Sequence, residues 1–131
     1  MNILIAPNAF KNSLTANDSA NAILDGLMRS RLYGNFVCFP IGDGGDGTGT
    51  LLAERFGGTK LEVDVKDPVG RKVLSSYYIV ENGKTAIIEM ATASGIRLLD
   101  NCELDPLHAT SVGTGELMVD AMSKGVEKVI I

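Results

Sequence analysis

The sequence predicts an α/β fold in which parallel strand–helix units are followed by the start of a second, mixed α/β domain. Two observations lead to this prediction. Uninterrupted apolar runs at residues 3–6 and 36–39 each precede a segment with helical spacing, which is typical of buried parallel strands and crossover helices. From residue 61 onward, apolar and polar residues alternate between turn sequences, which is typical of antiparallel strands. We therefore expect one domain over residues 1–66 and a second over residues 67–131.

The first domain has the order strand, helix, strand, helix. Residues 3–6 are expected to form a strand that is buried on both faces. Thr15 is a suitable N-cap for the first helix, with Asp18 three residues later, and this helix should end near residues 33–34. The order favours parallel pairing with right-handed crossovers, as in Rossmann- or flavodoxin-like folds. The apolar face of the first helix comprises Ala16, Ala20, Ile23, Leu24 and Leu27.

The rest of the chain combines strands, turns and two helices. Strands are expected at residues 61–66, 72–80 and 84–90, and Asn82-Gly83 between the last two predicts a hairpin with a type I′ turn. Thr114 should cap a helix that ends at Gly125, and another strand should begin at residue 126. The side chains expected to face inward from the helices of this stretch are Leu51, Leu52, Phe56, Leu117, Met118, Ala121 and Met122.

Composition excludes several functions. The 131 residues are 45% hydrophobic and 21% charged, with no apolar run near the roughly 18 residues of a membrane span. The N-terminus lacks signal-peptide features, so the cytoplasm is the default location. A net charge of −4 argues against a nucleic-acid-binding surface. Cys38 and Cys102 are interpreted as reduced packing residues, and His108, the single histidine, as a loop residue outside any hydrolase triad or zinc site.

The acidic, glycine-rich turn at residues 42–48 lies between a predicted buried strand and a helix, where open α/β sheets bind ligands. Its glycines allow positive φ angles, and N–H groups at a helix start can bind an anion. Asp43 and Asp46 would repel that anion unless Mg²⁺ bridged them or a substrate hydroxyl donated to Asp43. The alternative is a tight connection in which the glycines solve only a steric problem. The turn is not a Walker A loop, because no Lys-Ser/Thr pair follows its last glycine.

Three other segments carry side chains suited to chemistry. Lys11 lies in the loop after the first strand and could pair with a carboxylate or phosphoryl group, although many loop lysines are only solvated. Residues 110–116 join hydroxyls and glycines at a helix start, which suits an anion or a nucleotide but equally a capped helix entrance. Glu89 follows a buried strand and Ser94 adds a hydroxyl, which suits either a binding site or a rim position.

Taken together, these segments resemble the glycerate kinase family of bacterial sugar-acid catabolism over the whole length of the chain. Five motifs occur in the order of that family, and their common register makes the resemblance specific. Residues 5–14 are similar to IAPDSFKGSL, 42–48 to ADGGEGT, 67–71 to GPLGR, 88–95 to IEMAAASG and 106–117 to PLxTTSxGTGEL.

The resemblance implies phosphoryl transfer from ATP to D-glycerate, with 2-phosphoglycerate as the favoured product. It also implies Mg²⁺ and a two-domain architecture with the site in a cleft. In these implied roles, Lys11 holds a carboxylate or phosphoryl oxygen, and Asp43 accepts the glycerate hydroxyl proton or binds Mg²⁺. The expected partners are D-glycerate and the remainder of the kinase chain, with no nucleic acid and no membrane. The other residues expected to bind substrate or nucleotide are Asn8, Gly44, Gly45, Asp46, Glu89, Ser94, Ser111, Gly113, Thr114, Gly115 and Glu116.

Two departures from the family pattern bear on activity. Asn8 and Ala9 replace the usual Asp-Ser, and Asn12 replaces a frequent Gly or Glu; we expect Asn8 to substitute because its amide oxygen still accepts hydrogen bonds. The chain also ends on an apolar strand at Ile131, where family members continue into a GGSATNDGG-like segment. We therefore expect a fragment that is inactive alone. The alternative is a non-catalytic anion- or nucleotide-binding module that uses the same loops.

Overall fold

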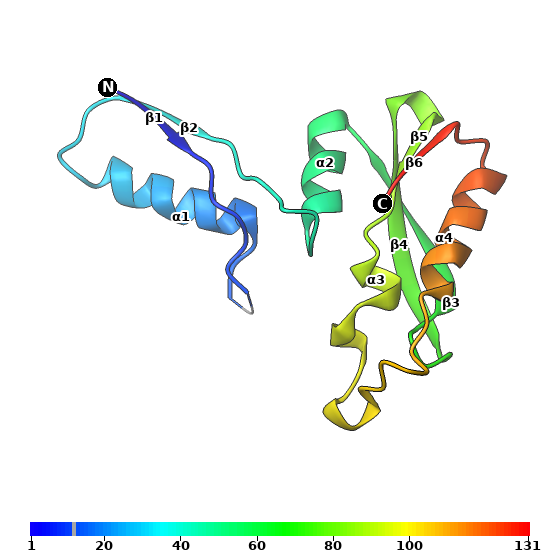
Figure 1. The fold of residues 1–131 in the computed structure, drawn as a ribbon. Helices are drawn as coiled ribbons and strands as arrows, with labels where there is room; N and C mark the ends of the chain where they lie inside the picture. Colours follow the sequence, from blue (N-terminus) through cyan, green and yellow to red (C-terminus); the bar gives the residue numbers. More distant parts are fainter. Residues whose placement is uncertain (12) are drawn as a thin grey trace. The chain divides into compact units, whose positions relative to one another are not determined.

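The computed structural model describes residues 1–11 and 13–131, and its fold is α/β, as predicted (Figure 1). The chain forms two compact units, Met1–Leu51 and Leu52–Ile131. The expected division at residue 66 falls inside the second unit, because β3 (Thr59–Lys66) pairs along its whole length with β4 (Lys72–Val80). Among the described residues, no helix has the length and apolar character needed to cross a bilayer.

The first unit contains a parallel strand pair, which confirms the predicted pairing. β1 (Asn2–Ile5) pairs with β2 (Asn35–Cys38), and α1 (Ala16–Met28) connects them. The Thr15 hydroxyl accepts a hydrogen bond from the Asp18 amide at 3.1 Å, which confirms the predicted N-cap.

Burial in the first unit differs from the prediction. Ala16 and Ala20 of α1 are buried, but Ile23 is exposed. Leu4 of β1 keeps 65% of its surface exposed, so the expected burial of this strand on both faces is wrong within this unit. A parallel strand is fully buried only when both faces of its sheet are covered, and here α1 packs against the strand pair from one side.

The first helix also ends earlier than predicted, at Met28 rather than near residues 33–34. Ser30 gives the local reason. Its hydroxyl donates to the Leu27 carbonyl at 2.7 Å and accepts from the Leu32 amide at 3.0 Å. A serine side chain that bonds to the backbone in this way competes with the next turn of helix.

The second unit is built on a mixed four-stranded sheet with the order β3-β4-β5-β6 (Figure 1). β4 is antiparallel to both β3 and β5 (Thr85–Ile87), whereas β6 (Lys128–Ile130) runs parallel to β5. α3 (Ala91–Ser94) and α4 (Val112–Ser123) contact each other and the sheet. The remaining helical elements of the chain are α2 (Thr48–Phe56) and short 3₁₀ segments at Glu81–Gly83, Ile96–Leu98 and Asn101–Glu103.

The core of the second unit lies between this sheet and its helices. Tyr77 of β4 is fully buried, and its hydroxyl donates to the Asp120 carboxylate of α4 at 2.8 Å. Burial raises the pKa of Tyr77, and the bond to Asp120 raises it further. The bond therefore satisfies a buried hydroxyl and links sheet to helix. The buried apolar cluster consists of Val65, Tyr77, Ala86, Ile88, Ala93, Leu117 and Ala121.

The predicted hairpin between β4 and β5 forms, but its turn differs from the prediction. Val80 pairs with Thr85, so the loop holds residues 81–84 and is longer than a two-residue type I′ turn. Residues 81–83 all have positive φ angles. The Glu81 carboxylate accepts a hydrogen bond from the Thr85 hydroxyl at 2.6 Å, which helps to hold a non-glycine residue in this uncommon conformation.

Other boundaries and orientations also differ. β5 ends at Ile87 rather than at residue 90, and the chain then turns into α3. α4 begins at Val112, so Thr114 lies inside the helix instead of capping it. Gly125 follows the end of α4 with a φ of 85°, as expected for a residue that stops a helix. Two side chains expected to face inward are exposed, Phe56 and Met122, while the nearby alanines Ala53 and Ala121 are buried.

Candidate functional site

Two loops of the first unit leave the same edge of the β1–β2 pair. Beyond the strands, the Phe39 amide donates to the Ile5 carbonyl at 2.8 Å, and the Ile41 amide donates to the Pro7 carbonyl at 3.0 Å. The two segments that follow β1 and β2 therefore stay side by side as far as Pro7 and Ile41. Beyond them lie the loop that begins at Asn8 and the turn at residues 42–48. This is the carboxyl edge of parallel strands, where α/β proteins commonly bind ligands.

The Asp43 turn is held in shape by its own groups. Gly44 and Gly47 have φ angles of 91° and 86°. The Gly44 amide donates to the Thr48 hydroxyl at 3.1 Å, and the Gly45 amide donates to the Asp43 carboxylate at 3.0 Å. Two N–H groups that could have bound an anion are thus used inside the turn. The steric interpretation explains part of this motif, and the exposed acids Asp43 and Asp46 remain accessible at its surface.

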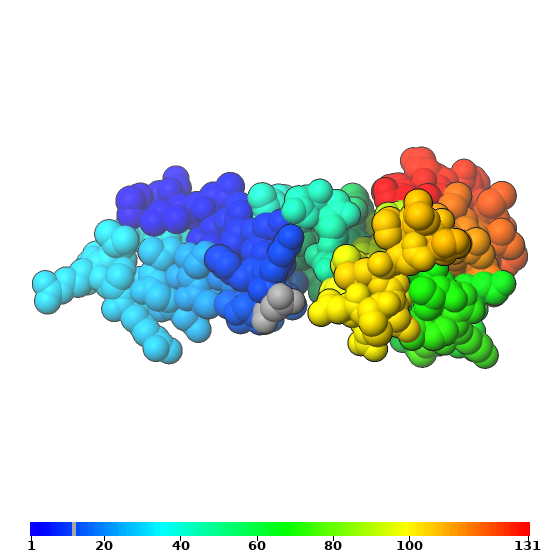
Figure 2. Space-filling view, turned by 60° about the horizontal axis from the view of Figure 1, so that its bottom comes forward, coloured from blue at the N-terminus to red at the C-terminus, as the bar shows by residue number. Residues whose placement is uncertain are grey.

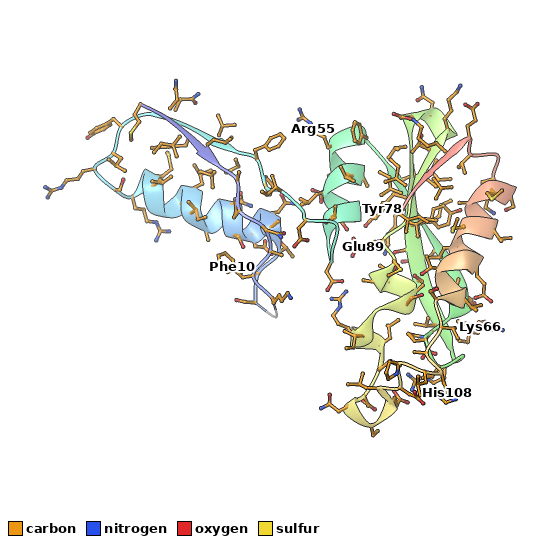
Figure 3. The ribbon with its side chains drawn as sticks, in the orientation of Figure 1. Phe10, Arg55, Lys66, Tyr78, Glu89 and His108 are labelled. Carbon is orange, nitrogen blue, oxygen red and sulfur yellow. The ribbon has the colours of Figure 1, made fainter. Side chains whose placement is uncertain are left out.

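Lys11 lies in a tight loop after β1. The backbone groups of Phe10 and Leu14 exchange hydrogen bonds of 3.0 and 3.1 Å, which closes the loop, and Phe10 marks its start in Figure 3. The Lys11 side chain is exposed. Asn8 is half-buried, and its amide oxygen accepts from the Ala9 amide at 2.7 Å. Asn12, where the sequence departs from the family pattern, lies outside the described residues.

In the second unit, Ser94 and Thr114 meet although they come from different helices. Their hydroxyls are 2.7 Å apart, which links α3 to α4. Thr114 is buried, and Glu89 is half-buried just before α3 (Figure 3). Thr92 fixes this segment further, because its hydroxyl donates to the Glu89 carbonyl at 2.8 Å.

The start of α4 packs closely against the end of β3. A Cβ atom added to Gly113 would lie 1.8 Å from the Lys66 carbonyl oxygen, so a glycine is required there. The Glu116 carboxylate accepts a hydrogen bond from the Lys66 amide at 2.7 Å. Close packing of the helix entrance against β3 therefore accounts for both residues. A Cβ atom on Gly115 would have open space around it.

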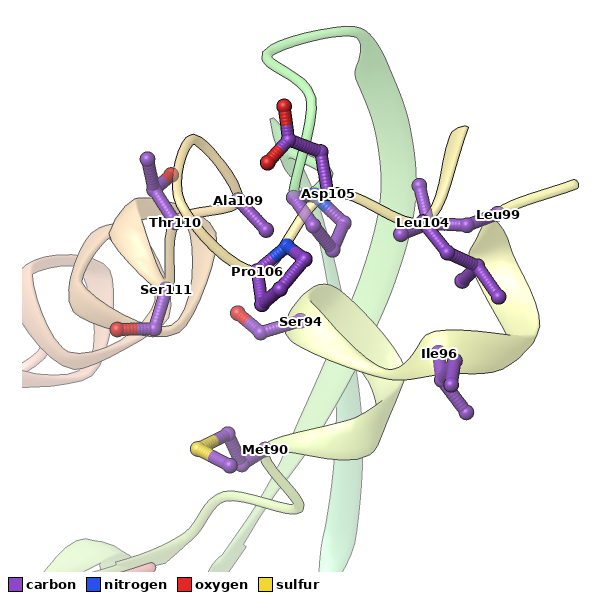
Figure 4. Close-up of a pocket in the computed structure, with 11 residues that line it drawn as sticks. Met90, Ser94, Ile96, Leu99, Leu104, Asp105, Pro106, Ala109, Thr110 and Ser111 are labelled. Carbon is purple, nitrogen blue, oxygen red and sulfur yellow. The ribbon is translucent and has the colours of Figure 1, made fainter. Parts of the chain in front are cut away.

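An open groove of about 550 Å³ lies beside this helix entrance (Figure 4). Ser94 and Ser111 reach its wall, whereas Glu89 and residues 113–116 do not. Figure 2 shows that the residues around position 100, drawn in yellow, lie at the surface of this unit. Most of the lining is apolar, as in many small-molecule sites. The lining residues are Pro68, Met90, Ser94, Ile96, Leu99, Leu104, Asp105, Pro106, Ala109, Thr110 and Ser111.

Sequence reasoning missed three apolar members of this groove, Ile96, Leu99 and Leu104. Ile96 and Leu104 are exposed, yet they lie in no expected strand or helix and in none of the five motifs. The signal that could have found them is a run of large apolar residues between turn sequences in a segment without regular structure. Exposed apolar residues that gather around a few hydroxyls indicate a binding surface.

His108 contacts a neighbouring carboxylate. His108 is exposed, and its Nδ1 lies 2.7 Å from an Asp105 carboxylate oxygen, an interaction that lowers the pKa of Asp105. Over residues 1–11 and 13–131, no three His, Cys, Asp or Glu side chains converge as a metal site. Mg²⁺ needs no such cluster, because it usually takes one or two carboxylates together with substrate phosphates. Asp43 and Asp46 offer donors of this kind.

Comparison with known proteins gives a consistent result. The sequence model of the glycerate kinase family matches residues 3–131. A glycerate kinase from Haemophilus influenzae is 44% identical over all of this chain, and a glycerate 2-kinase from Escherichia coli is 41% identical. The solved structure of a protein assigned as glycerate kinase 2 from Salmonella typhimurium superimposes with a TM-score of 0.78 at 39% identity. The chain spans 35% of the Haemophilus and Salmonella proteins and 34% of the Escherichia protein.

Proposed function

Because the family match spans residues 3–131, the chain belongs to the glycerate kinase family, and we propose that its complete polypeptide transfers a phosphoryl group from ATP to D-glycerate. The observation that supports this most is the common sheet edge of two loops, one with exposed Lys11 and one with exposed Asp43. Phosphoryl transfer depends mainly on positioning and charge neutralisation, and a cation and a carboxylate at one edge are suited to it.

The 2-hydroxyl of glycerate is the proposed acceptor, with 2-phosphoglycerate as product. The 41% identical relative from Escherichia coli is named a glycerate 2-kinase, which favours this hydroxyl over the 3-hydroxyl.

In the proposed reaction, Asp43 acts on the acceptor hydroxyl. The Gly45 amide holds one oxygen of its carboxylate, which orients the group. As the glycerate oxygen bonds to the γ-phosphorus and the bond to ADP breaks, the hydroxyl proton passes to the Asp43 carboxylate. Lys11 binds a carboxylate or phosphoryl oxygen. Mg²⁺ would neutralise phosphate charge, and Asp46 would hold it, joined by Asp43 in the alternative in which Asp43 binds the metal instead of taking the proton.

Residues of the second unit have binding roles in this proposal. Ser94 and Ser111 supply hydroxyls to the groove, and Glu89 lies just before it in the chain. Gly113, Thr114 and Glu116 act indirectly, because their contacts fix α4 against β3 and α3. Since the chain spans about a third of its relatives, we propose that it is inactive without the remaining polypeptide. A cytoplasmic location belongs to the same proposal.

The test is ADP release by the complete polypeptide with D-glycerate and Mg-ATP, with parallel reactions that lack glycerate. Phosphorus NMR of the product distinguishes 2-phosphoglycerate from 3-phosphoglycerate. Steady turnover that requires D-glycerate is expected, and the 131-residue chain alone should show none. A folded, complete polypeptide that binds Mg-ATP but never turns over would contradict the kinase proposal and favour a non-catalytic nucleotide-binding module.

A further inference from the structure

The turn between β3 and β4 is built around a buried carboxylate. Asp67 is only 4% exposed. One of its oxygens accepts from the Val69 and Arg71 amides at 3.0 and 2.8 Å, and the other accepts from the Arg71 Nε at 2.6 Å. Burial opposes ionisation, but the hydrogen bonds from Arg71 and Val69 outweigh it, so the pKa of Asp67 lies below its usual value. The turn therefore presents the Arg71 side chain in a fixed direction.

From this turn, Arg71 reaches a segment about 30 residues later in the chain. Its two terminal nitrogens donate to the two oxygens of Glu103 at 2.7 and 3.2 Å, and one of them also donates to the Leu98 carbonyl at 3.0 Å. A planar guanidinium suits this paired geometry, whereas a lysine ammonium cannot make all of these bonds at once. Glu103 in turn accepts from the Asp100 amide at 2.9 Å. The Arg71 guanidinium, a planar fork of N–H donors, thus fixes both ends of residues 98–103.

These contacts bear on the groove because some of its lining residues belong to the turn at Asp67–Arg71 or to the segment that Arg71 holds. Leu99 and Leu104, inside and next to the segment held by Arg71, form part of the apolar wall. Pro68 of the turn also lines the groove, and its carbonyl accepts from the Thr110 amide at 3.0 Å. One turn therefore anchors the apolar wall through Arg71 and the hydroxyl-bearing wall through Pro68.

We propose that Arg71 is a positioning residue that holds residues 98–103 and thereby places Leu99 and Leu104 in the apolar wall of this groove, and that it sets ligand binding in the kinase in this way. This inference rests on the proposed function for its kinetic consequence but not for its structural one. The Arg71 side chain is 50% exposed and lies outside the buried core cluster. In Arg71→Met the Val69 and Arg71 amides still donate to the buried Asp67 carboxylate, so removal of the guanidinium should alter the local wall more than the stability of the whole fold.

The experiment compares Arg71→Met, Arg71→Lys and Glu103→Gln in the complete polypeptide. Hydrogen exchange follows the amides of residues 98–104, and KM and kcat are measured separately for D-glycerate and Mg-ATP. In Arg71→Met, hydrogen exchange of the amides of residues 98–104 should accelerate about tenfold. KM for either D-glycerate or Mg-ATP should rise about tenfold, while kcat stays within about threefold of the wild-type value. Arg71→Lys should recover part of both effects. Lys60→Met is the matched control, because the exposed Lys60–Glu62 ion pair does not line the groove and should change neither quantity.

The exchange data decide whether Arg71 holds residues 98–103. Unchanged exchange at residues 98–104 in Arg71→Met overturns the proposal, and so does a loss of stability throughout the fold with no local excess in exchange. If Arg71→Met fails to fold, Glu103→Gln tests the same wall, because it leaves the Asp67–Arg71 turn intact. If the wild-type polypeptide does not phosphorylate glycerate, the proposed function fails, but the exchange comparison still decides whether Arg71 holds the wall.

Discussion

The two units of this chain use similar sequence signals with different results. In the first unit, the apolar strands stay largely open, and Leu4, Val37 and Phe39 are exposed. In the second, the same kind of residue is enclosed between a four-stranded sheet and its helices, with Tyr77 and Leu117 fully buried. An apolar strand is buried only where other elements cover its faces, and a two-stranded pair with one helix provides little cover.

This difference in burial divides the candidate site residues into exposed loop residues and residues that already have structural partners. Asp43 and Lys11 lie in exposed loops of the first unit, where a change of side chain disturbs little packing. Thr114 and Glu116 of the second unit already have structural partners, so their substitution would affect fold and site together. We therefore predict that activity and stability separate at Asp43 and Lys11 and are coupled at Thr114 and Glu116.

The largest expected effect is on catalysis in the first unit. Asp43→Asn should lower kcat of the complete polypeptide by roughly 10²–10⁴-fold, because the amide cannot accept the hydroxyl proton. The urea midpoint should hardly change, since the side chain is exposed. Steady-state ADP release and urea unfolding check the two halves of this statement. An equal loss of folding would show that the turn is mainly a steric device.

A paired truncation tests the difference in burial. Leu117→Ala should lower the free energy of unfolding by about 2–5 kcal/mol, because a fully buried side chain leaves a cavity. Leu4→Ala should change it by less than about 0.5 kcal/mol in the 131-residue chain. Urea unfolding of both variants provides the measurement. Similar losses would mean that β1 is packed far more tightly than its exposure indicates.

A glycine pair within α4 gives a smaller effect. Gly113→Ala should destabilise the fold by about 1–3 kcal/mol, because its Cβ would meet the Lys66 carbonyl. Gly115→Ala has open space and should be neutral or stabilise by up to about 1 kcal/mol, because alanine favours helix. Thermal unfolding separates the two. If Gly113→Ala is also tolerated, α4 does not pack against β3 as closely as described.

The smallest expected effect concerns pH. The pKa of Asp67 is lowered in the folded state, so its contribution to stability is present above the ordinary value of about 3.9 and is lost as pH falls below it. Urea midpoints of the wild type should therefore decline between pH 5 and the acid range. Asp67→Asn should be less stable at pH 7 and should show a shallower decline. Parallel pH curves for the two proteins would contradict a stabilising Asp67–Arg71 pair.

Local signals were sufficient for much of the fold. The apolar runs predicted the parallel β1–β2 pair, the alternation after residue 61 predicted the antiparallel strands, and Thr15 and Gly125 mark helix ends as expected. Predictions failed where a nonlocal contact or a competing local bond intervened. Thr114 resembles a cap by sequence, but α4 begins at Val112, and the buried Thr114 hydroxyl lies 2.7 Å from the Ser94 hydroxyl of α3.

For the candidate site, the sequence by itself determined the residue types and the family: the acidic glycine turn, Lys11 and the five motifs in register. Only the tertiary structure decided which of these side chains are available. It assigned Gly113 and Glu116 to packing, joined Ser94 to Thr114, and formed a groove in which Ile96, Leu99 and Leu104, which belong to no motif, join residues of three motifs. The physical reason is that capping and periodicity depend on neighbours in the chain, whereas availability depends on contacts such as the fork from Arg71 to Glu103, which span many residues of sequence.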